Sequence, residues 1–309
     1  MIRKIGVGEI GVIIVMFTPK EADIENVINI AESYEGVIVD NSSKRNFDTD
    51  CVGMMKYIYL GENTGIANAQ NVGLIYLNRF GKINYFLFLD QDSRIDNNYP
   101  LLMVSEYVKI KRRVPKLALL GPTVVEIDTQ QEYRSMFHSF STSCDGFEQR
   151  RDVISSGSIV EKCVIEDVGL MLLTLFIDFV DYEWCWRAEA SGYVVGITKN
   201  VRISHKVGES DISIGHYKVQ IWSPIRYFYQ FRNHLLLCTL SYVPLQWKIV
   251  TSIKHFIRLL YFPLFVSRGG KSWKNMWRGI FAFTKHRKKF MEEIVQYRNT
   301  RKCYENGYM

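Results

Sequence analysis

Tyr85-Phe86-Leu87-Phe88-Leu89-Asp90-Gln91-Asp92 is the stretch that decides the fold. Five apolar residues in a row are typical of a strand that is buried on both faces, as parallel strands covered by helices are. The predicted strand runs directly into Asp90 and Asp92. Ligands bind outside the carboxyl ends of the strands in open parallel sheets, so this acidic end is predicted to lie at a binding site.

The same pattern recurs through the first half of the chain, where apolar runs alternate with helix-like segments. Strands are predicted at Val12–Phe17, Gly36–Val39, Tyr57–Leu60 and Leu117–Gly121, and helices at Glu21–Ser33 and Gly65–Asn78. Further on, helices are expected near Ser158–Asp167 and from Asp181, a strand at Val201–His205, and irregular structure over Asp128–Arg151. The alternation predicts an α/β fold with a mixed, mostly parallel sheet flanked by helices.

The C-terminal part has a different character. The chain has 309 residues and a formal net charge of +7, yet 14 Lys/Arg against three Glu lie from Lys248 onward, and the preceding residues are mildly acidic. Helices are predicted at Trp222–Tyr242, Val243–Val266 and Ser272–Gln296. We therefore expect a first domain over residues 1–220, with halves that meet at about residue 120, and a helical region over 221–309.

Several classes of protein are disfavoured by composition. The six cysteines are scattered without a C-x-x-C pair, and no secretory signal peptide precedes them, so reduced thiols in a cytosolic protein are expected. No apolar window reaches the roughly 18 residues of a membrane-spanning helix. The acidic body and the lack of a known binding module argue against nucleic acid as a partner.

The segment Lys248–Lys289 mixes aromatic and basic residues. This composition suits helices that lie in the interface of an anionic membrane. The alternative is that the aromatic residues pack as core or as a dimer interface while the charges are merely solvated. A peripheral membrane contact and a homo-oligomer are both open interpretations.

Two carboxylates one residue apart, Asp90 and Asp92, can address a hard divalent cation and, through it, a diphosphate. Asp is also frequent in turns for local hydrogen-bonding reasons, so the pair alone is weak evidence. The run Gly61–Gly73 is dense in Gly, Asn and Gln. Its small residues suit close helix–sheet packing, whereas the amides of Asn63 and Gln70 could hold a nucleotide or sugar hydroxyl. It is not a phosphate loop of the known patterns.

Asp178–Arg187 gathers three carboxylates, two indoles and a guanidinium in ten residues. Asp181 at a helix N-terminus has two readings. Its charge can stabilise the helix end, or it can act as a general base on a sugar hydroxyl. His205 ends a predicted strand, where it is either a hydrogen-bonded core residue or a metal ligand.

In this order, the motifs resemble the family 2 glycosyltransferases, and specifically the bacterial rhamnosyltransferases that build cell-surface polysaccharides. The matching segments are Phe17-Thr18, Val39–Ser42, Glu62–Gly73, Leu89–Ser93, Ser155–Ser158, Phe176–Arg187 and His205, which together span about residues 10–240. One segment, Glu166–Leu175, is more apolar than the acidic turn often found at that place in the family.

The resemblance implies a GT-A fold, a nucleotide-sugar donor and Mg²⁺ or Mn²⁺. It implies donor-binding roles for Phe17, Thr18, Asp40, Asn41, Asn63, Gly65, Gln70, Asp90, Gln91 and Asp92, with Asp40 reading the pyrimidine base. Asp92, Asp90 and His205 would hold the metal, and Asp181 would be the base of an inverting transfer. Gly157, Glu183, Trp184 and Arg187 would lie on the acceptor side, with Arg187 supporting the motif through an ion pair.

The reaction implied is transfer of L-rhamnose from dTDP-rhamnose to a lipid-linked saccharide of an O-antigen or capsule. The enzyme would be cytoplasmic and peripheral on the inner face of the bacterial plasma membrane. A UDP-sugar donor, for galactosyl, glucosyl or galactofuranosyl transfer, is an alternative. A nucleotidylyltransferase would need a basic, Gly-rich loop after the first strand, where Met16–Ala22 offers only Lys20. A non-catalytic scaffold that binds sugar nucleotides would not need a base at Asp181.

Overall fold

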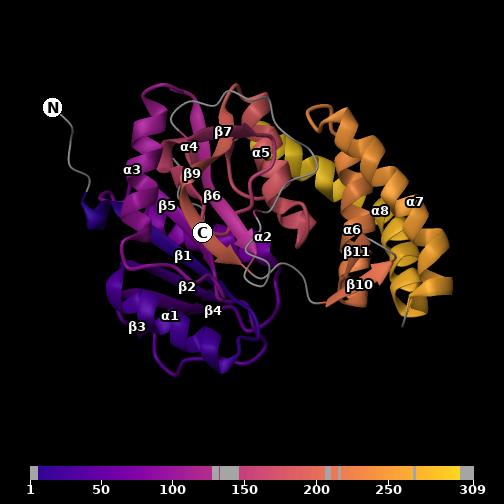
Figure 1. Ribbon diagram of the computed structural model, residues 1–309, viewed down its shortest axis with the longest axis horizontal. Helices are drawn as coiled ribbons and strands as arrows, with labels where there is room; N and C mark the ends of the chain where they lie inside the picture. Colours follow the sequence, from indigo (N-terminus) through magenta and orange to yellow (C-terminus); the bar gives the residue numbers. More distant parts are fainter. Residues whose placement is uncertain are drawn as a thin grey trace.

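The computed structural model describes residues 6–126, 132, 146–205, 210–214, 217–266 and 269–299. It is an α/β structure in which helices cover both faces of one large sheet (Figure 1). The strands are β1 (Ile10–Met16), β2 (Gly36–Asp40), β3 (Cys51–Val52), β4 (Met55–Tyr59), β5 (Tyr85–Asp90), β6 (Leu117–Glu126), β7 (Phe147–Arg150), β8 (Ile159–Glu161), β9 (Val194–His205), β10 (Ser210–Ile214) and β11 (Tyr217–Ile221). The helices are α1 (Glu21–Ser33), α2 (Ile66–Asn78), α3 (Tyr99–Lys111), α4 (Lys162–Val168), α5 (Val180–Ala190), α6 (Pro224–Cys238), α7 (Leu245–Phe265) and α8 (Gly269–Asn299).

Nine strands form the sheet in the order β3-β4-β2-β1-β5-β8-β6-β9-β7, and β10 and β11 form a separate hairpin. The central strands β4, β2, β1 and β5 are mutually parallel. Strand β8 is antiparallel to both of its neighbours, β5 and β6, and β6 is parallel to β9. The sheet is thus mixed and mostly parallel, as the sequence predicts.

Two apolar cores lie on the two faces of the sheet. Side chains of β1 alternate between them, because successive residues of a strand point to opposite faces. Ile13 and Val15 pack with α2, α4 and α5, whereas Val12 and Ile14 pack with α1 and α3. Every residue of β1 is buried. This burial on both faces explains why the strand is apolar throughout instead of alternating.

The C-terminal helices α6, α7 and α8 pack together beside the sheet (Figure 1). They share a small core of Tyr227, Phe231, Phe262 and Met276. Other residues of the same helices, such as Leu236 and Phe290, enter the larger core on the α2 face of the sheet. Part of the aromatic content therefore packs as core. Among the described helices, none is long and apolar enough to cross a membrane.

Two of the predicted elements differ from the structure. The helix expected over Ser158–Asp167 is wrong in its first part, since β8 occupies Ile159–Glu161 before α4 begins at Lys162. The reason is that Ser155–Ser158 turns the chain back along β5, and the next residues complete the sheet. Strand β7 lies within the stretch predicted to be irregular, most of which falls outside the described residues. Helix α3 and the β10–β11 hairpin were not predicted.

Candidate active site

The acidic strand ends predicted from the sequence lie at one edge of the sheet. In the register of the parallel strands, Met16 of β1 pairs with Asp40 of β2, and Val15 pairs with Asp90 of β5. Asp40 and Asp90 therefore flank the end of β1, from which the chain leaves the sheet. This edge is where a doubly wound sheet binds its ligand.

The backbone that leaves β1 is hydrogen-bonded by side chains that follow the two neighbouring strands, β5 and β2. The Phe17 amide donates to Oε1 of Gln91 at 2.7 Å, and the Thr18 amide donates to Oγ of Ser42 at 2.8 Å. Thr18 has a positive φ of 43°, and the Phe17 side chain is largely exposed. Phe17 and Thr18 thus face solvent at the strand ends, while Gln91 braces their backbone.

Asp40, which is predicted to read the pyrimidine base, lies buried at the end of β2. Its side chain is fully buried, and its carboxylate accepts hydrogen bonds from the Ser42 amide, from the amide and Nδ2 of Asn46, and from the Tyr57 hydroxyl. Burial, followed by the hydrogen bond to Asp40, raises the pKa of Tyr57 to about 12, so the phenol stays protonated and donates. Asp40 fixes the loop after β2 from within the protein.

The loop before α2 is built from amide side chains. Nδ2 of Asn41 donates to Oδ1 of Asn63, which also accepts the Gly65 amide, and Oδ1 of Asn41 accepts the Thr64 amide at 2.7 Å. Gly65 has φ +89°, and a Cβ there would lie 2.6 Å from the carbonyl oxygen of Phe176. Asn41 and Asn63 therefore shape the loop, and Gly65 lets the chain before α5 approach it.

The Asp90-x-Asp92 turn presents two partly buried carboxylates at the end of β5. Ser93 fixes the turn, because its Oγ accepts the Asp90 amide and its own amide donates to the Asp90 carbonyl, both at 3.0 Å. Within the described part of the chain, no group of three His, Cys, Asp or Glu could hold a metal. Two carboxylates suffice for Mg²⁺ or Mn²⁺ when phosphate oxygens and water complete the shell, so the donor set fits such an ion.

His205 is the last residue of β9, and its side chain lies outside the described residues. Its backbone is close to the acidic turn, because an isolated antiparallel bridge pairs Arg94 with Ser204. The end of β9 and the turn after β5 are therefore neighbours, although they are more than 100 residues apart in sequence.

Hydrogen bonds of Ser155 and Ser156 join their own segment to α2, to α5 and to the turn after β5. Nε2 of Gln70, in α2, donates to Oγ of Ser155 at 3.0 Å, and the Ser155 amide donates to Oδ2 of Asp181 at 3.2 Å. The hydroxyls of Ser156 and Ser93 lie 2.9 Å apart. These two serines were not among the predicted site residues. Their place in the S-S-G-S motif was the available signal.

Three of the predicted acceptor-side residues, Gly157, Glu183 and Arg187, lie buried within the protein. Gly157 is a buried turn residue with φ +77°, and its carbonyl accepts the Tyr99 hydroxyl. Glu183 is fully buried and accepts hydrogen bonds from Arg187, at 2.9 and 3.1 Å, and from the Tyr242 hydroxyl. The ion pair expected for Arg187 is present. These groups are buried and bonded within the protein, and their place on the acceptor side stays a prediction.

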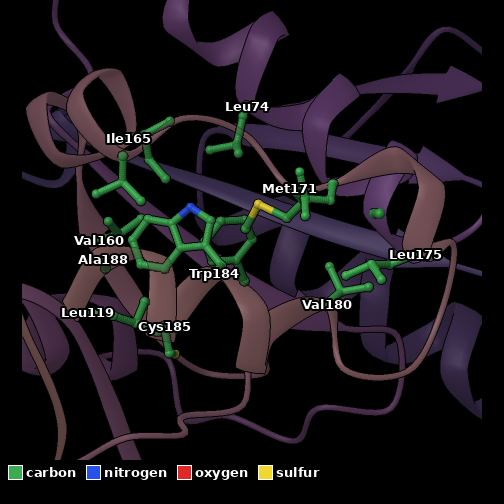
Figure 2. Packing of buried hydrophobic residues seen from close by; sticks show 14 of the residues in the cluster. Leu74, Leu119, Val160, Ile165, Met171, Leu175, Val180, Trp184, Cys185 and Ala188 are labelled. Atoms are coloured by element: carbon green, nitrogen blue, oxygen red, sulfur yellow. The ribbon is translucent and has the colours of Figure 1, made fainter. Parts of the chain in front are cut away.

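Trp184 is likewise a core residue. Its indole is 2% exposed and donates to the Gly169 carbonyl at 2.8 Å. Figure 2 shows the ring among apolar side chains of α2, the sheet and the segment before α5, including Leu74, Val160, Ile165 and Met171. The ring anchors α5 to the sheet, and the place of Trp184 on the acceptor side stays a prediction.

Asp181, in the first turn of α5, is the titratable group at the centre of this network. Burial raises the pKa of its carboxyl, and the nearby Asp178 carboxylate raises it further, whereas the Ser155 amide and Arg226 lower it. Asp181 also borders a cavity about large enough for one water molecule, lined by Phe88, Leu119, Ser155, Ser158, Val160, Ile165, Met171 and Trp184. A raised pKa in such surroundings is typical of a general base or acid.

The loop that precedes Asp181 is strained. Phe176, Asp178 and Phe179 all have positive φ, between 63° and 66°. Thr18 is the remaining non-glycine residue with positive φ in the described part of the chain, and it lies at the end of β1. Such conformations cost about 1–3 kcal/mol each and persist only where the surroundings enforce them. Their concentration here indicates a functional loop.

Helix α6 holds this loop in place, a feature that the sequence did not reveal. Nδ2 of Asn233 donates to the carbonyls of Leu175, Ile177 and Asp178, and Arg232 donates to the carbonyls of Thr174 and Leu175. The guanidinium of Arg226 forms an ion pair with the Asp178 carboxylate at 2.5 Å. These contacts fix the backbone from which Asp181 projects.

The fold and site together define a nucleotide-sugar transferase of the GT-A type. A comparison with protein-family models found no match. Among curated proteins, the dTDP-rhamnosyl transferase RfbF of Shigella flexneri is 34% identical over 223 residues, which cover 68% of this chain and 72% of that protein. The chain therefore belongs to the rhamnosyltransferase branch of the family 2 glycosyltransferases.

Solved structures agree with the fold. The crystal structure of S. aureus TarS 1-349 matches with a TM-score of 0.52 at 14% identity, covering 97% of this chain and 92% of that one. The crystal structure of GalNAc-T7 with UDP, GalNAc and Mn²⁺ matches with a TM-score of 0.54 at 13% identity, covering 95% of this chain and 58% of that one. At these identities the likeness concerns the GT-A fold alone.

Proposed function

We propose that this glycosyltransferase moves L-rhamnose from dTDP-L-rhamnose to a saccharide hydroxyl with inversion at the anomeric carbon. The observation that carries the proposal is the position of Asp181. Its carboxylate is joined through Ser155 to Gln70 of the α2 motif, beside the serine pair that fixes the Asp90-x-Asp92 turn. The similarity to a dTDP-rhamnosyl transferase supports the choice of donor.

In this proposal the donor lies across the ends of β1, β2 and β5. Phe17 and Thr18, which face solvent there, line the nucleoside pocket. Asp40 contributes through the loop that it fixes, and Asn41, Asn63 and Gly65 through the shape of the loop before α2. The residues 1–220 form the transferase domain, with the donor half in about the first 120 residues.

Asp90 and Asp92, with His205 from the end of β9, would hold Mg²⁺ or Mn²⁺ against the donor diphosphate. When bound, such a cation stabilises the negative charge that grows on the leaving diphosphate. Ser93 keeps the two carboxylates in one turn. The GalNAc-T7 structure, which has this fold, holds Mn²⁺.

Asp181 performs the proton transfer. Its carboxylate takes the proton of the acceptor hydroxyl while that oxygen forms a bond to the anomeric carbon and the bond from that carbon to the diphosphate breaks. The hydroxyl attacks from the face opposite the leaving group, so a single displacement inverts the centre. The raised pKa of Asp181 makes the carboxylate a stronger base than an exposed Asp.

The acceptor in this proposal is a lipid-linked saccharide of an O-antigen or capsule pathway. The enzyme then works on the cytoplasmic side of the bacterial plasma membrane as a peripheral protein. The basic C-terminal helices support this location.

The substitution Asp181→Asn tests the proposal. The amide is nearly isosteric but cannot accept the proton, so kcat should fall by about 10²–10⁴-fold while the Kd for dTDP-L-rhamnose changes little. Asp167→Asn is the matched control, because Asp167 is exposed and bonded to the Tyr193 hydroxyl away from the site. Transfer by Asp181→Asn at the wild-type rate would remove Asp181 from the mechanism. NMR of the product reports the anomeric configuration.

A further inference from the structure

Helix α7 carries a continuous stripe of exposed apolar side chains. Its members recur at intervals of three or four residues, except for the adjacent pair Phe256 and Ile257, and each is about half to three-quarters exposed: Leu245, Ile249, Ile253, Phe256, Ile257, Leu260 and Leu264. The opposite side of the helix carries Trp247, Thr251, His255 and Phe262, which are buried. Helix α7 thus has two apolar sides. One packs within the protein, and the other has no partner within the described part of the chain.

A row of aromatic side chains on α8 adjoins this stripe. Trp273, Trp277 and Phe281 are exposed and lie one above the next, with ring centroids about 6 Å apart. Nε1 of Trp273 donates to the Leu259 carbonyl of α7 at 3.0 Å, which places the row beside that helix. The seven residues of α7 and these three aromatic residues are called the α7–α8 apolar face below.

Positive charge borders this face along α8. The sequence contains no Asp or Glu from Ile212 through Met291, a stretch with 14 Lys/Arg. On α8, Lys271, Lys274, Arg278 and Lys285 are exposed beside the aromatic row. An exposed apolar surface bordered by cations, with aromatic rings at its margin, matches the composition of a membrane interface.

We infer that the α7–α8 apolar face docks onto an anionic lipid bilayer, with α7 lying in the plane of the interface. The apolar side chains enter the acyl boundary, and the lysines and arginines contact lipid phosphates. A second copy of this chain is a poorer partner, because its own face would bring the same positive charge and no carboxylates. This inference rests on the proposed function in one respect: an enzyme with a lipid-linked acceptor works at a membrane surface.

The test uses the full chain with large unilamellar vesicles of phosphatidylcholine, alone or with phosphatidylglycerol, in a sedimentation assay. We expect binding to the anionic vesicles that weakens in high salt. The triple substitution Phe256→Gln, Leu260→Gln and Leu264→Gln should weaken it by roughly tenfold or more, since these side chains no longer gain from burial. Lys271→Gln, Lys274→Gln and Arg278→Gln together should weaken it by roughly 100-fold.

Leu102→Gln is the matched control, because Leu102 is an exposed apolar residue on α3, away from the face, and its loss should leave vesicle binding unchanged. Equal binding of wild type and both triple variants, or no binding to anionic vesicles, would overturn the inference. So would a dimer in sedimentation velocity that the α7 variant converts to a monomer. Calorimetric binding of dTDP-L-rhamnose to the same variants should be unchanged, and this separates failure of the inference from failure of the proposed function.

Discussion

The basicity of Asp181 depends on the residues around it. Burial and the Asp178 carboxylate raise the pKa of its carboxyl, while the Ser155 amide and the Arg226 guanidinium lower it. Asp178 and Arg226 form an ion pair with each other, so each tempers the effect of the other on Asp181. A glycosyl transfer at neutral pH needs a carboxylate that is ionised yet more basic than an exposed Asp. In the proposed mechanism, the Asp178–Arg226 pair therefore adjusts the pKa of Asp181.

This arrangement predicts that substitutions of Asp178 and Arg226 move the acid limb of the kcat/KM profile in opposite directions. Asp178→Asn removes a negative charge and leaves Arg226 unpaired, so the pKa of Asp181 falls and the acid limb of kcat/KM moves to lower pH. Asn also tolerates the positive φ at this position. Arg226→Gln removes a positive charge, so the pKa rises and the acid limb moves to higher pH. Acid limbs that move in the same direction in both variants would contradict this account.

At this scale, the sequence identified residues at the ends of elements more reliably than buried ones. Asp90, Asp92 and Asp181 lie at the strand and helix ends where the pattern placed them. The sequence did not predict that the carboxylates of Asp40 and Glu183 accept hydrogen bonds from Tyr57 and Tyr242, which come from other elements. Nothing local in a sequence shows that a distant hydroxyl will occupy a carboxylate.

The loop before α2 and the loop before α5 approach each other closely, since the Ala67 amide donates to the Phe176 carbonyl at 3.3 Å. This close approach depends on Gly65, where a Cβ would meet the Phe176 carbonyl. The φ of +89° and ψ of 156° at Gly65 also belong to a region that is essentially restricted to glycine. The loop before Asp181 therefore packs closely against Gly65.

Gly65→Ala should both destabilise the protein and impair transfer. Gly61→Ala is its control, because Gly61 has a similar φ of +80° but nothing within 4 Å of the added Cβ. We expect a loss of about 1 kcal/mol for Gly61→Ala from backbone strain alone. For Gly65→Ala we expect a loss larger by about 2 kcal/mol or more and a reduced kcat. Urea unfolding and steady-state kinetics check this, and equal losses in the two variants would refute the role of the contact.

Apolar runs made the central strands β1, β2 and β5 predictable, because burial on both faces leaves few other interpretations. Strand β8 was missed because its three residues are too few to show a period and follow directly on a turn. The apolar segment Glu166–Leu175, which departs from the family pattern, has a structural explanation. Its backbone is bonded by side chains of Asn71, Trp184 and Arg187 within the core.

At the scale of the whole molecule, the C-terminal region is bonded to the loop before α5 and to α5 itself. Asn233 and Arg232 of α6 bind the carbonyls before α5, and Tyr242 binds Glu183 within it. From α8, the Glu293 carboxylate accepts the amides of Leu173 and Thr174, at the start of a short 3₁₀ turn in the same segment. Helix α8, which carries part of the proposed membrane face, therefore also holds the segment before α5.

Glu293→Gln should lower the Tm, since it weakens a charged cap on that turn. A loss of about 1 kcal/mol corresponds to roughly 1–2 °C in a chain of this length. Glu292→Gln serves as the control, because Glu292 is exposed and lies 3.9 Å from Lys288 at the surface. Calorimetry should show a single transition in each case. Equal Tm values for the two variants would contradict a stabilising contact between Glu293 of α8 and the segment before α5.

Calorimetric titration of the purified chain with dTDP-L-rhamnose, UDP-galactose and UDP-glucose, each with Mg²⁺ or Mn²⁺ and again with a chelator, tests the central claim most directly. The account predicts binding that is selective for dTDP-L-rhamnose and lost with the chelator. Selective binding of a UDP-sugar would contradict the assignment of the donor. Absence of binding to all three would contradict the site at the ends of β1, β2 and β5.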